Sequence, residues 1–172
     1  MSVRHRAVAL AGAALLAGCA TVGADGAGGG GGNASAPDDS VAITIAQGPC
    51  FGACPVYSAT LDKAGAVRFE GKRFTAMSGV QTASRSPESF AAFRDFVAPY
   101  KPARGTIAVT EDCEPRATDH PAITVTWEAA DGTQTVLRHD TGCHSESGRA
   151  TTEALRQAPE WLGITEWVKR AG

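Results

Sequence analysis

Four cysteines after residue 40 are the residues of this chain best suited to chemistry. Cys50 and Cys54 stand close together in Cys-Phe-Gly-Ala-Cys-Pro, whereas Cys113 and Cys143 are far apart. Paired thiols form structural disulfides or, where a thiolate is stabilised, exchange disulfides with other molecules. Thioredoxin-like dithiols are Cys-x-x-Cys at a helix N-terminus, but this pair has three intervening residues, and Pro55 lacks an amide that could stabilise a thiolate. We therefore expect structural disulfides, with thiol-disulfide exchange at Cys50 and Cys54 as the alternative.

The pairing of these four thiols is open to three arrangements. Of these, we favour Cys50 with Cys54 and Cys113 with Cys143. The first bond closes a tight local loop, and it requires a turn containing Gly52 that brings the two α-carbons within about 7 Å. The second bond ties the segment after residue 110 to the end of a later hairpin. Closing this loop of about 30 residues contributes roughly 3 to 4 kcal/mol to stability in the chain-entropy model.

Residue types that bind metals also gather in the second half of the chain. They are cysteines and histidines: Cys113, His120, His139, Cys143 and His144. A structural zinc site needs four converging ligands, and these positions match no finger or ribbon pattern. The acidic stretch 111–119 lacks the order of carboxylates found in an EF-hand calcium loop, so we interpret it as a solvated loop. We expect no metal and no cofactor.

Nucleophilic catalysis has little support in the sequence. The chain contains no Gly-x-Ser-x-Gly or His-Glu-x-x-His motif. Ser145 is next to His144 only along the chain, which does not place a base at its hydroxyl. Asp119 before His120 fits a turn as well as it fits an oriented imidazole. The sequence therefore favours a non-catalytic domain over an enzyme.

Alternating hydrophobic residues predict the strands that must position these side chains. The expected strands are 41–46, 56–61, 66–70, 73–77 (with an extension past Gly79), 122–128 and 133–139. Residues 48–55 hold two glycines and two prolines, which favour a turn over either regular structure. Gly65 and Gly132 are expected in hairpin turns. The stretch 101–121 is expected to be irregular.

Two helices are expected between and after these strands. Ser86 is suited to cap the first helix, with Pro87 at its first position. The hydrophobic stripe of this helix consists of Phe90, Phe93, Phe96, Val97 and Tyr100. A second helix is expected from about 149 to 157, ending before Pro159, and an apolar C-terminal cluster follows it. This order predicts an α+β fold, with an antiparallel sheet and helices packed on one face as a two-layer sandwich.

The N-terminus has the pattern of a secretory signal. Basic residues within 1–6 precede an apolar run over 7–16 that is too short to span a bilayer. The run ends in Leu-Ala-Gly-Cys, which resembles the bacterial lipobox. The resemblance implies that the signal peptide 1–18 is cleaved and that Cys19 carries acyl chains as a membrane anchor. With Ala20 after the cysteine, the resemblance implies sorting to the outer membrane, on its periplasmic face.

Residues 19–40 form the expected connection between the lipidated cysteine and the domain. Five consecutive glycines at 28–32 and few large apolar side chains make this segment unable to bury a core. A flexible tether of this length has a mean reach of roughly 25 Å. Residues 41–172 then suit a single domain. The whole chain has a net charge of −2 and no basic run, so nucleic acid is not an expected partner.

The motif around the first cysteine pair also resembles that of a known family. Cys-Phe-Gly-Ala-Cys-Pro-Val-Tyr at 50–57, followed by a strand, a glycine turn and a strand that runs into Phe-Glu-Gly at 69–71, is similar to the bacterial family called domain of unknown function 6438. Thr118, Asp119 and Gly132 extend the similarity to most of residues 41–167. In this family the two cysteines of the motif often occur alone, which implies a local bond between them. The family has no assigned activity.

The sequence as a whole predicts an outer-membrane-anchored periplasmic lipoprotein with a small, disulfide-stapled domain. This domain is expected to be a non-catalytic binding or envelope-maintenance module. The expected partners are the membrane, through the N-terminal lipid anchor on Cys19, and an envelope protein or ligand. The alternative is a periplasmic thiol-disulfide or metal-handling protein that uses Cys50 and Cys54.

Overall fold

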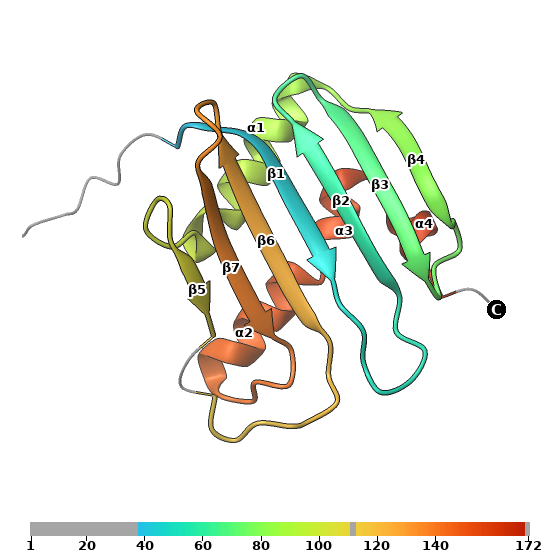
Figure 1. Cartoon of the computed structure of the whole chain (residues 1–172), viewed down its shortest axis with the longest axis vertical. Coiled ribbons are helices and arrows are strands. Elements are labelled where there is room, and N and C mark those ends of the chain that lie inside the picture. Colours follow the sequence, from blue (N-terminus) through green and yellow to red (C-terminus); the bar gives the residue numbers. More distant parts are fainter. Residues whose placement is uncertain (1–37, 111–112, 171–172) are drawn as a thin grey trace, which may run out of the picture. The chain divides into compact units, whose positions relative to one another are not determined.

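A computed structural model of the chain describes residues 38–110 and 113–170. Their central feature is a seven-stranded sheet with the order β4-β3-β2-β1-β6-β7-β5, and the helices lie behind it in Figure 1. The strands are β1 (Ser40–Gln47), β2 (Val56–Asp62), β3 (Ala66–Arg73), β4 (Gly79–Ser84), β5 (Ile107–Val109), β6 (Ala122–Ala129) and β7 (Gln134–Asp140). Neighbouring strands are antiparallel, except that β5 runs parallel to β7. The predicted α+β fold is confirmed.

The middle strand β1 shows how the sheet separates its two faces. Ile43 and Ile45 are buried, while Thr44 between them points to the other face and its hydroxyl lies 2.7 Å from that of Thr60 on β2. Alternate residues of a strand point to opposite faces, so one face of the sheet is apolar and the other is polar. The core between the sheet and the helices contains Tyr57, Leu61, Phe69, Phe93, Val125, Trp127, Leu155 and Leu162, among others.

The first helix begins where the sequence predicts. The helices are α1 (Pro87–Val97), η1 (Ala98–Tyr100), α2 (Glu146–Leu155), α3 (Ala158–Leu162) and α4 (Thr165–Val168). Ser86 is the N-cap residue of α1, although its hydroxyl accepts no capping bond and lies 3.3 Å from that of Ser89. The helix buries Phe90, Phe93 and Val97, as the predicted stripe requires.

The second predicted helix begins three residues earlier than expected. Ser145 caps α2, because its hydroxyl oxygen accepts a hydrogen bond from the backbone N–H of Gly148 at 3.1 Å. The helix ends at Leu155, before the predicted residue 157. A new helix begins directly afterwards, because Pro159 lies in the first turn of α3, where a missing N–H is tolerated.

The predicted strand 73–77 is wrong. β3 continues to Arg73, and residues 74–78 form a loop before β4. Phe74 has a positive φ of 56°, which no strand residue adopts. The loop amides of Ala76 and Met77 donate to the carbonyls of Lys169 and Trp167, at 2.8 and 3.2 Å. The C-terminal segment therefore supplies the hydrogen-bond acceptors for these loop amides, although it lies far away in the sequence.

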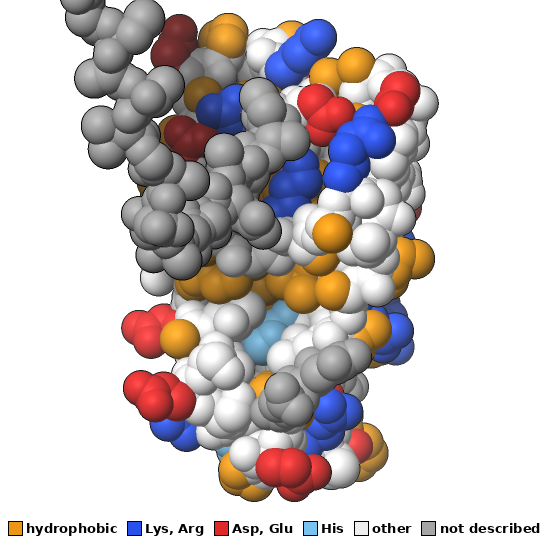
Figure 2. Space-filling view, turned by 90° about the vertical axis from the view of Figure 1, so that its left-hand side faces the viewer, with side chains coloured by type: hydrophobic (Ala, Val, Ile, Leu, Met, Phe, Trp, Pro, Cys, Tyr) orange, Lys and Arg blue, Asp and Glu red, His pale blue; other side chains and the backbone are white. Residues whose placement is uncertain are grey.

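The stretch 101–121, expected to be irregular, contains the short edge strand β5. It is joined to β7 by a bond from Val136 N–H to the carbonyl of Thr106 at 2.9 Å and one from Thr110 N–H to the carbonyl of Arg138 at 3.0 Å. Ile107 and Val109 leave 76% and 54% of their surfaces exposed. In the view from this edge, Figure 2 shows a band of hydrophobic side chains, with charged side chains above and below it.

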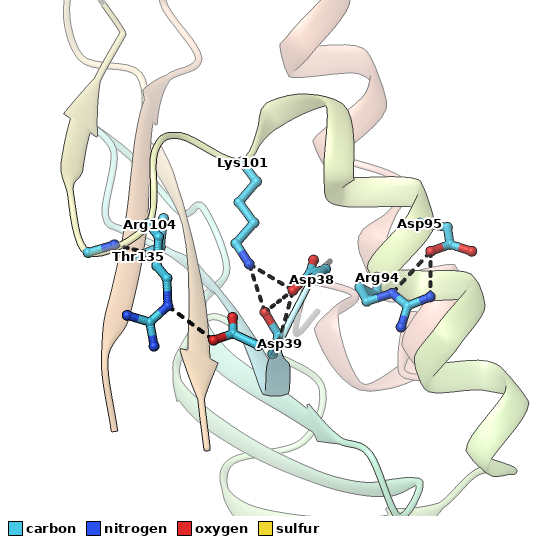
Figure 3. A network of polar contacts seen from close by, with 9 residues as sticks. Asp38, Asp39, Arg94, Asp95, Lys101, Arg104 and Thr135 are labelled. Carbon is cyan, nitrogen blue, oxygen red and sulfur yellow. Dashed lines mark hydrogen bonds and ion pairs between the residues drawn. The ribbon is translucent and has the colours of Figure 1, made fainter. Parts of the chain in front are cut away.

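Ion pairs hold the beginning of β1 to the segment that follows α1 (Figure 3). Lys101 Nζ lies 2.7 Å from Asp38 Oδ1 and donates to the hydroxyl of Ser40 at 3.0 Å. Arg104 donates to Asp39 at 3.0 Å and to Asp131, in the β6–β7 turn, at 2.6 Å. These contacts fix the two residues before β1 to the segment after α1.

The predicted signal peptide 1–18, Cys19 and the tether up to residue 37 lie outside the described residues. Within residues 38–110 and 113–170, no helix combines the length and the apolar character needed to cross a membrane.

Candidate functional site

Both disulfides lie at one end of the sheet, the lower end in Figure 1, where β1 and β7 finish and β2 and β6 begin. Three loops meet there, with residues 48–55, 113–121 and 141–145. Viewed from the β5 edge, this end of the molecule presents hydrophobic, acidic and basic side chains next to one another (Figure 2). The loops place most of the sequence-predicted site residues together.

The first loop is closed by the favoured disulfide between Cys50 and Cys54. Their α-carbons are 5.8 Å apart, within the limit set by the sequence argument. Gly52 has a φ of 135°, a conformation that an L side chain rarely adopts, so this turn depends on glycine. No helix starts at this loop, since β2 begins at Val56. The loop therefore lacks the helix dipole that activates thioredoxin-like dithiols.

Backbone hydrogen bonds hold this loop against the neighbouring one. The N–H of Phe51 donates to the carbonyl of Asp119 at 3.1 Å, and Gly48 N–H donates to the carbonyl of Ala122 at 2.9 Å. The side-chain amide of Gln47 donates to the carbonyl of Pro55 at 2.8 Å, across the base of the loop. Phe51 itself is nevertheless exposed to solvent, with 89% of its surface accessible.

The second favoured disulfide, between Cys113 and Cys143, is also formed, and both cysteines are buried. It lies beneath the first turn of α2, where a Cβ on Gly148 would collide with Cys143 Sγ. Two hydrogen bonds support the same connection, from Ala117 N–H to the carbonyl of Gly142 at 2.8 Å and from His144 N–H to the carbonyl of Pro115 at 3.0 Å. The loop of residues 113–121 is thereby fixed to the turn that precedes α2.

A pocket of about 670 Å³ opens beside this second disulfide. Its floor contains the buried residues Thr141, Cys143 and Thr152. The remaining lining residues are polar or charged, and they are His120, His144, Arg149, Glu153, Arg156 and Gln157. We call this cavity the α2 pocket. The rings of His120 and His144 lie 6.0 Å apart between centroids and meet edge to face, although they come from different loops.

His139 is a buried structural residue rather than a member of the pocket wall. It is 1% exposed, and its ring nitrogens lie 2.8 Å from the hydroxyl of Thr110 and 2.7 Å from that of Thr152. Burial lowers the pKa of His139, and the charge of Arg156 acts in the same direction against an opposing effect of Asp140. The side chain is therefore neutral at physiological pH.

The metal-ligand types in the second half of the chain do not converge into a site. Cys113 and Cys143 are bonded to each other, and His139 is separated from the pocket by Thr152. Across the described residues, no group of three or more His, Cys, Asp and Glu side chains is arranged to hold a metal ion. In the acidic stretch, Glu114 and Asp119 are exposed, while residues 111 and 112 lie outside the described part.

The residues considered for nucleophilic catalysis have other roles. The Ser145 hydroxyl accepts the capping bond of α2 from the Gly148 N–H, at 3.1 Å. Asp119 has a positive φ of 68° and supplies its carbonyl to Phe51, while its carboxylate accepts from Thr118 at 3.3 Å. His120 lies on the rim of the α2 pocket. The turn interpretation of Asp119 therefore agrees with the structure.

Sequence reasoning missed the charged residues on α2. Arg149, Glu153 and Arg156 are spaced by four and three positions, which places them on one face of a helix. This spacing was the available signal, but the helix was expected to begin only at residue 149. With the helix in its observed position, the three charges form one wall of the α2 pocket.

Comparisons with known proteins identify the family but no individual relative. A search of curated proteins and a search of solved structures each give no significant match. The family model described as "Domain of unknown function (DUF6438)" matches residues 41–162, which include both disulfides and the α2 pocket. The resemblance to this family predicted from the sequence is thereby confirmed. This chain belongs to the DUF6438 family.

Proposed function

We propose that this protein is an outer-membrane lipoprotein, held on the periplasmic face by acyl chains on Cys19, whose domain docks a second envelope protein through Phe51. The domain acts as a non-catalytic binding module. The observation that carries this proposal is the exposed ring of Phe51 on a loop that is otherwise firmly held.

The support for the location comes from sequence and redox chemistry. The Leu-Ala-Gly-Cys motif ending at Cys19 resembles the signal for lipid attachment, and the apolar run before it has the pattern of a secretory signal. Two disulfides in one small domain fit an oxidising compartment such as the periplasm. A lipid anchor also fits the glycine-rich composition of the segment before the domain, because such compositions are typical of linkers.

The support for docking is that the Cys50–Cys54 loop is ordered although the Phe51 ring that it carries is not buried. A phenylalanine that stays in water gains none of the roughly 1.5 to 3 kcal/mol that burial of such a side chain gives. Yet the disulfide and the backbone bond to Asp119 order the chain on which this ring stands. Ordering a binding loop in advance lowers the entropy lost on association. Aromatic anchors that fill a pocket of the partner are typical interface hot spots.

A site-specific photo-crosslink tests this proposal in intact cells. A photoreactive phenylalanine analogue at position 51 is expected to capture one discrete envelope protein. The matched control is the same analogue at Val80, which is 52% exposed on edge strand β4 and lies in a different part of the sheet. Equal labelling from both positions, or retention of the captured partner by the Phe51→Ser variant, would show that Phe51 does not dock it.

The anchor is tested separately. Cys19→Ser should remove uptake of labelled palmitate and release the protein from the outer-membrane fraction. If the variant still incorporates label and sediments with outer membranes, Cys19 is not the lipidated residue.

Thiol-disulfide exchange at Cys50 and Cys54 is the second candidate function. The observation in its favour is that these cysteines are only half buried, whereas Cys113 and Cys143 are inaccessible. A redox function requires rapid reduction of the Cys50–Cys54 bond by a mild thiol in the folded protein. Mass spectrometry after alkylation without denaturant distinguishes the two functions, because the docking proposal requires this bond to stay oxidised.

A further inference from the structure

We propose that the α2 pocket binds a small organic anion, through a carboxylate or phosphate group held between the arginines of α2 and the two histidines of the facing loops. This site is separate from the docking surface at Phe51 and does not depend on it.

The size and construction of the pocket suit a small ligand. Its volume of about 670 Å³ falls within the usual range for small-molecule sites, roughly 300 to 1,000 Å³. Its floor is rigid, since Cys143 is disulfide-bonded, Thr141 donates to the carbonyl of Pro121 at 2.7 Å, and Thr152 is hydrogen-bonded to His139. A fixed floor below a polar rim provides a preformed cavity.

The charge of the rim favours an anion. Arg149 lies in α2 and Arg156 is its C-cap residue, with helical backbone angles. They are seven residues apart, which is about two helical turns, so both side chains lie on the same side of the helix and line the pocket. Glu153 between them is the only carboxylate among the described residues that line the pocket. This described rim carries a net positive charge even when His120 and His144 are neutral. Guanidinium groups present paired donors that match carboxylate and phosphate oxygens.

One arginine is already oriented towards the pocket. Arg149 donates from Nη1 to the carbonyl of His144 at 2.6 Å, which ties its guanidinium to the histidine-bearing turn and leaves its other N–H groups for a ligand. The imidazoles of His120 and His144 line the pocket as well and add further hydrogen-bonding groups.

The simpler interpretation of these charges is a set of ion pairs along an exposed helix. Such pairs would join Glu153 to Arg149 one turn earlier or to Arg156 one turn later. Neither ion pair is formed among the described residues, although all three side chains border the same cavity. Both arginines therefore border the cavity without an ion pair to Glu153.

Calorimetric titration of the full mature lipoprotein in non-ionic detergent at about 0.15 M salt tests this inference. The probes are citrate for a carboxylate source and inorganic phosphate. A third arm measures binding to vesicles of phosphatidylglycerol against phosphatidylcholine, which separates a lipid headgroup from a free anion. We expect at least one anion to bind with a dissociation constant below roughly 1 mM.

The variant Arg149→Gln/Arg156→Gln is expected to weaken that binding at least tenfold. The control Arg68→Gln/Arg73→Gln removes the same charge from exposed residues of β3, far along the sheet from α2, and should leave binding unchanged. Both arginine pairs are exposed, so circular dichroism should show that each variant folds. The proposal is overturned if none of the probes binds, or if the control weakens binding as much as the α2 variant does.

Discussion

Lys101 and Asp38 form an ion pair of 2.7 Å across 63 residues of sequence, with only 17% and 19% of their side-chain surfaces exposed. Burial alone would disfavour the Asp38 carboxylate, but hydrogen bonds from Lys101 and Ser40 outweigh it and lower the pKa of Asp38 below its ordinary value. The contact fixes the residues that lead into β1 to the segment after α1, at the end of the sheet opposite the two disulfides.

Lys101→Met is expected to lower the free energy of unfolding by about 1 to 2 kcal/mol, because it leaves the Asp38 carboxylate without its charged partner. Urea unfolding at neutral pH measures this. Arg104→Gln is the matched control, since Arg104 is 49% exposed in its ion pairs, and we expect a smaller loss for it. If both substitutions lower the free energy of unfolding equally, burial of the Lys101–Asp38 pair does not determine how much it stabilises the fold.

The pH dependence of stability should follow His139. Its pKa is lowered in the folded state by burial, so the unfolded chain binds a proton more readily. The contribution of neutral His139 is fully present above the unfolded value near 6.5 and declines as the pH falls through that value towards the lower folded pKa. Wild-type stability should therefore decrease between pH 7.5 and 5.

His139→Gln should reduce that decrease, since glutamine can still bond to Thr110 and Thr152 but does not titrate. Urea midpoints at the two pH values, with exposed His120→Gln as the comparison, provide the measurement. An unchanged pH dependence in His139→Gln would assign the effect to other groups.

The two disulfides should contribute unequally to stability. Cys50→Ala/Cys54→Ala is expected to lower the free energy of unfolding by about 1 to 2 kcal/mol, because a five-residue loop constrains the unfolded chain little. Cys113→Ala/Cys143→Ala should lower it by roughly 3 kcal/mol or more, since its loop is longer and its cysteines are buried. Urea unfolding of both variants decides the order. A larger loss from the short loop would contradict the chain-entropy argument here.

Gly148→Ala should destabilise the domain by about 1 to 3 kcal/mol, although alanine normally favours helices over glycine. The reason is the close approach of the disulfide, since a Cβ at this position would collide with Cys143 Sγ. Ser147→Ala, at the exposed neighbouring position, is the control and should not lower the thermal midpoint. If Gly148→Ala is as stable as wild type, the first turn of α2 can move away from the disulfide.

Most of the sheet could be predicted from the sequence, because strands such as β1 and β6 show their burial pattern as alternating hydrophobic and polar residues. The loop at 74–78 could not be predicted, because its amides bond to the carbonyls of Trp167 and Lys169, which lie far along the chain. Strand β5 has three residues, which is too short for an alternation to be recognised, and it exists through its pairing with β7.

The candidate site was only partly predictable for the same reason. Spacing and loop geometry favour the two observed disulfides among three possible arrangements. The α2 pocket does not, since it joins His120 from one loop, His144 from another and three charges from a helix. Its floor also depends on Gly148, whose role appears only once Cys143 is seen below it.

The position of β1 determines how the domain would carry a mechanical load. The strand lies between β2 and β6, and it joins the residues held by Lys101 at one end to the Phe51 loop at the other. A pull between Ser40 and Phe51 therefore acts on the two ends of one strand that is already extended, so the covalent backbone of β1 carries the load and has little length to gain. The hydrogen bonds to β2 and β6 run perpendicular to the strand and keep it in this extended conformation. Under tension, the domain would behave as a stiff link between its two ends.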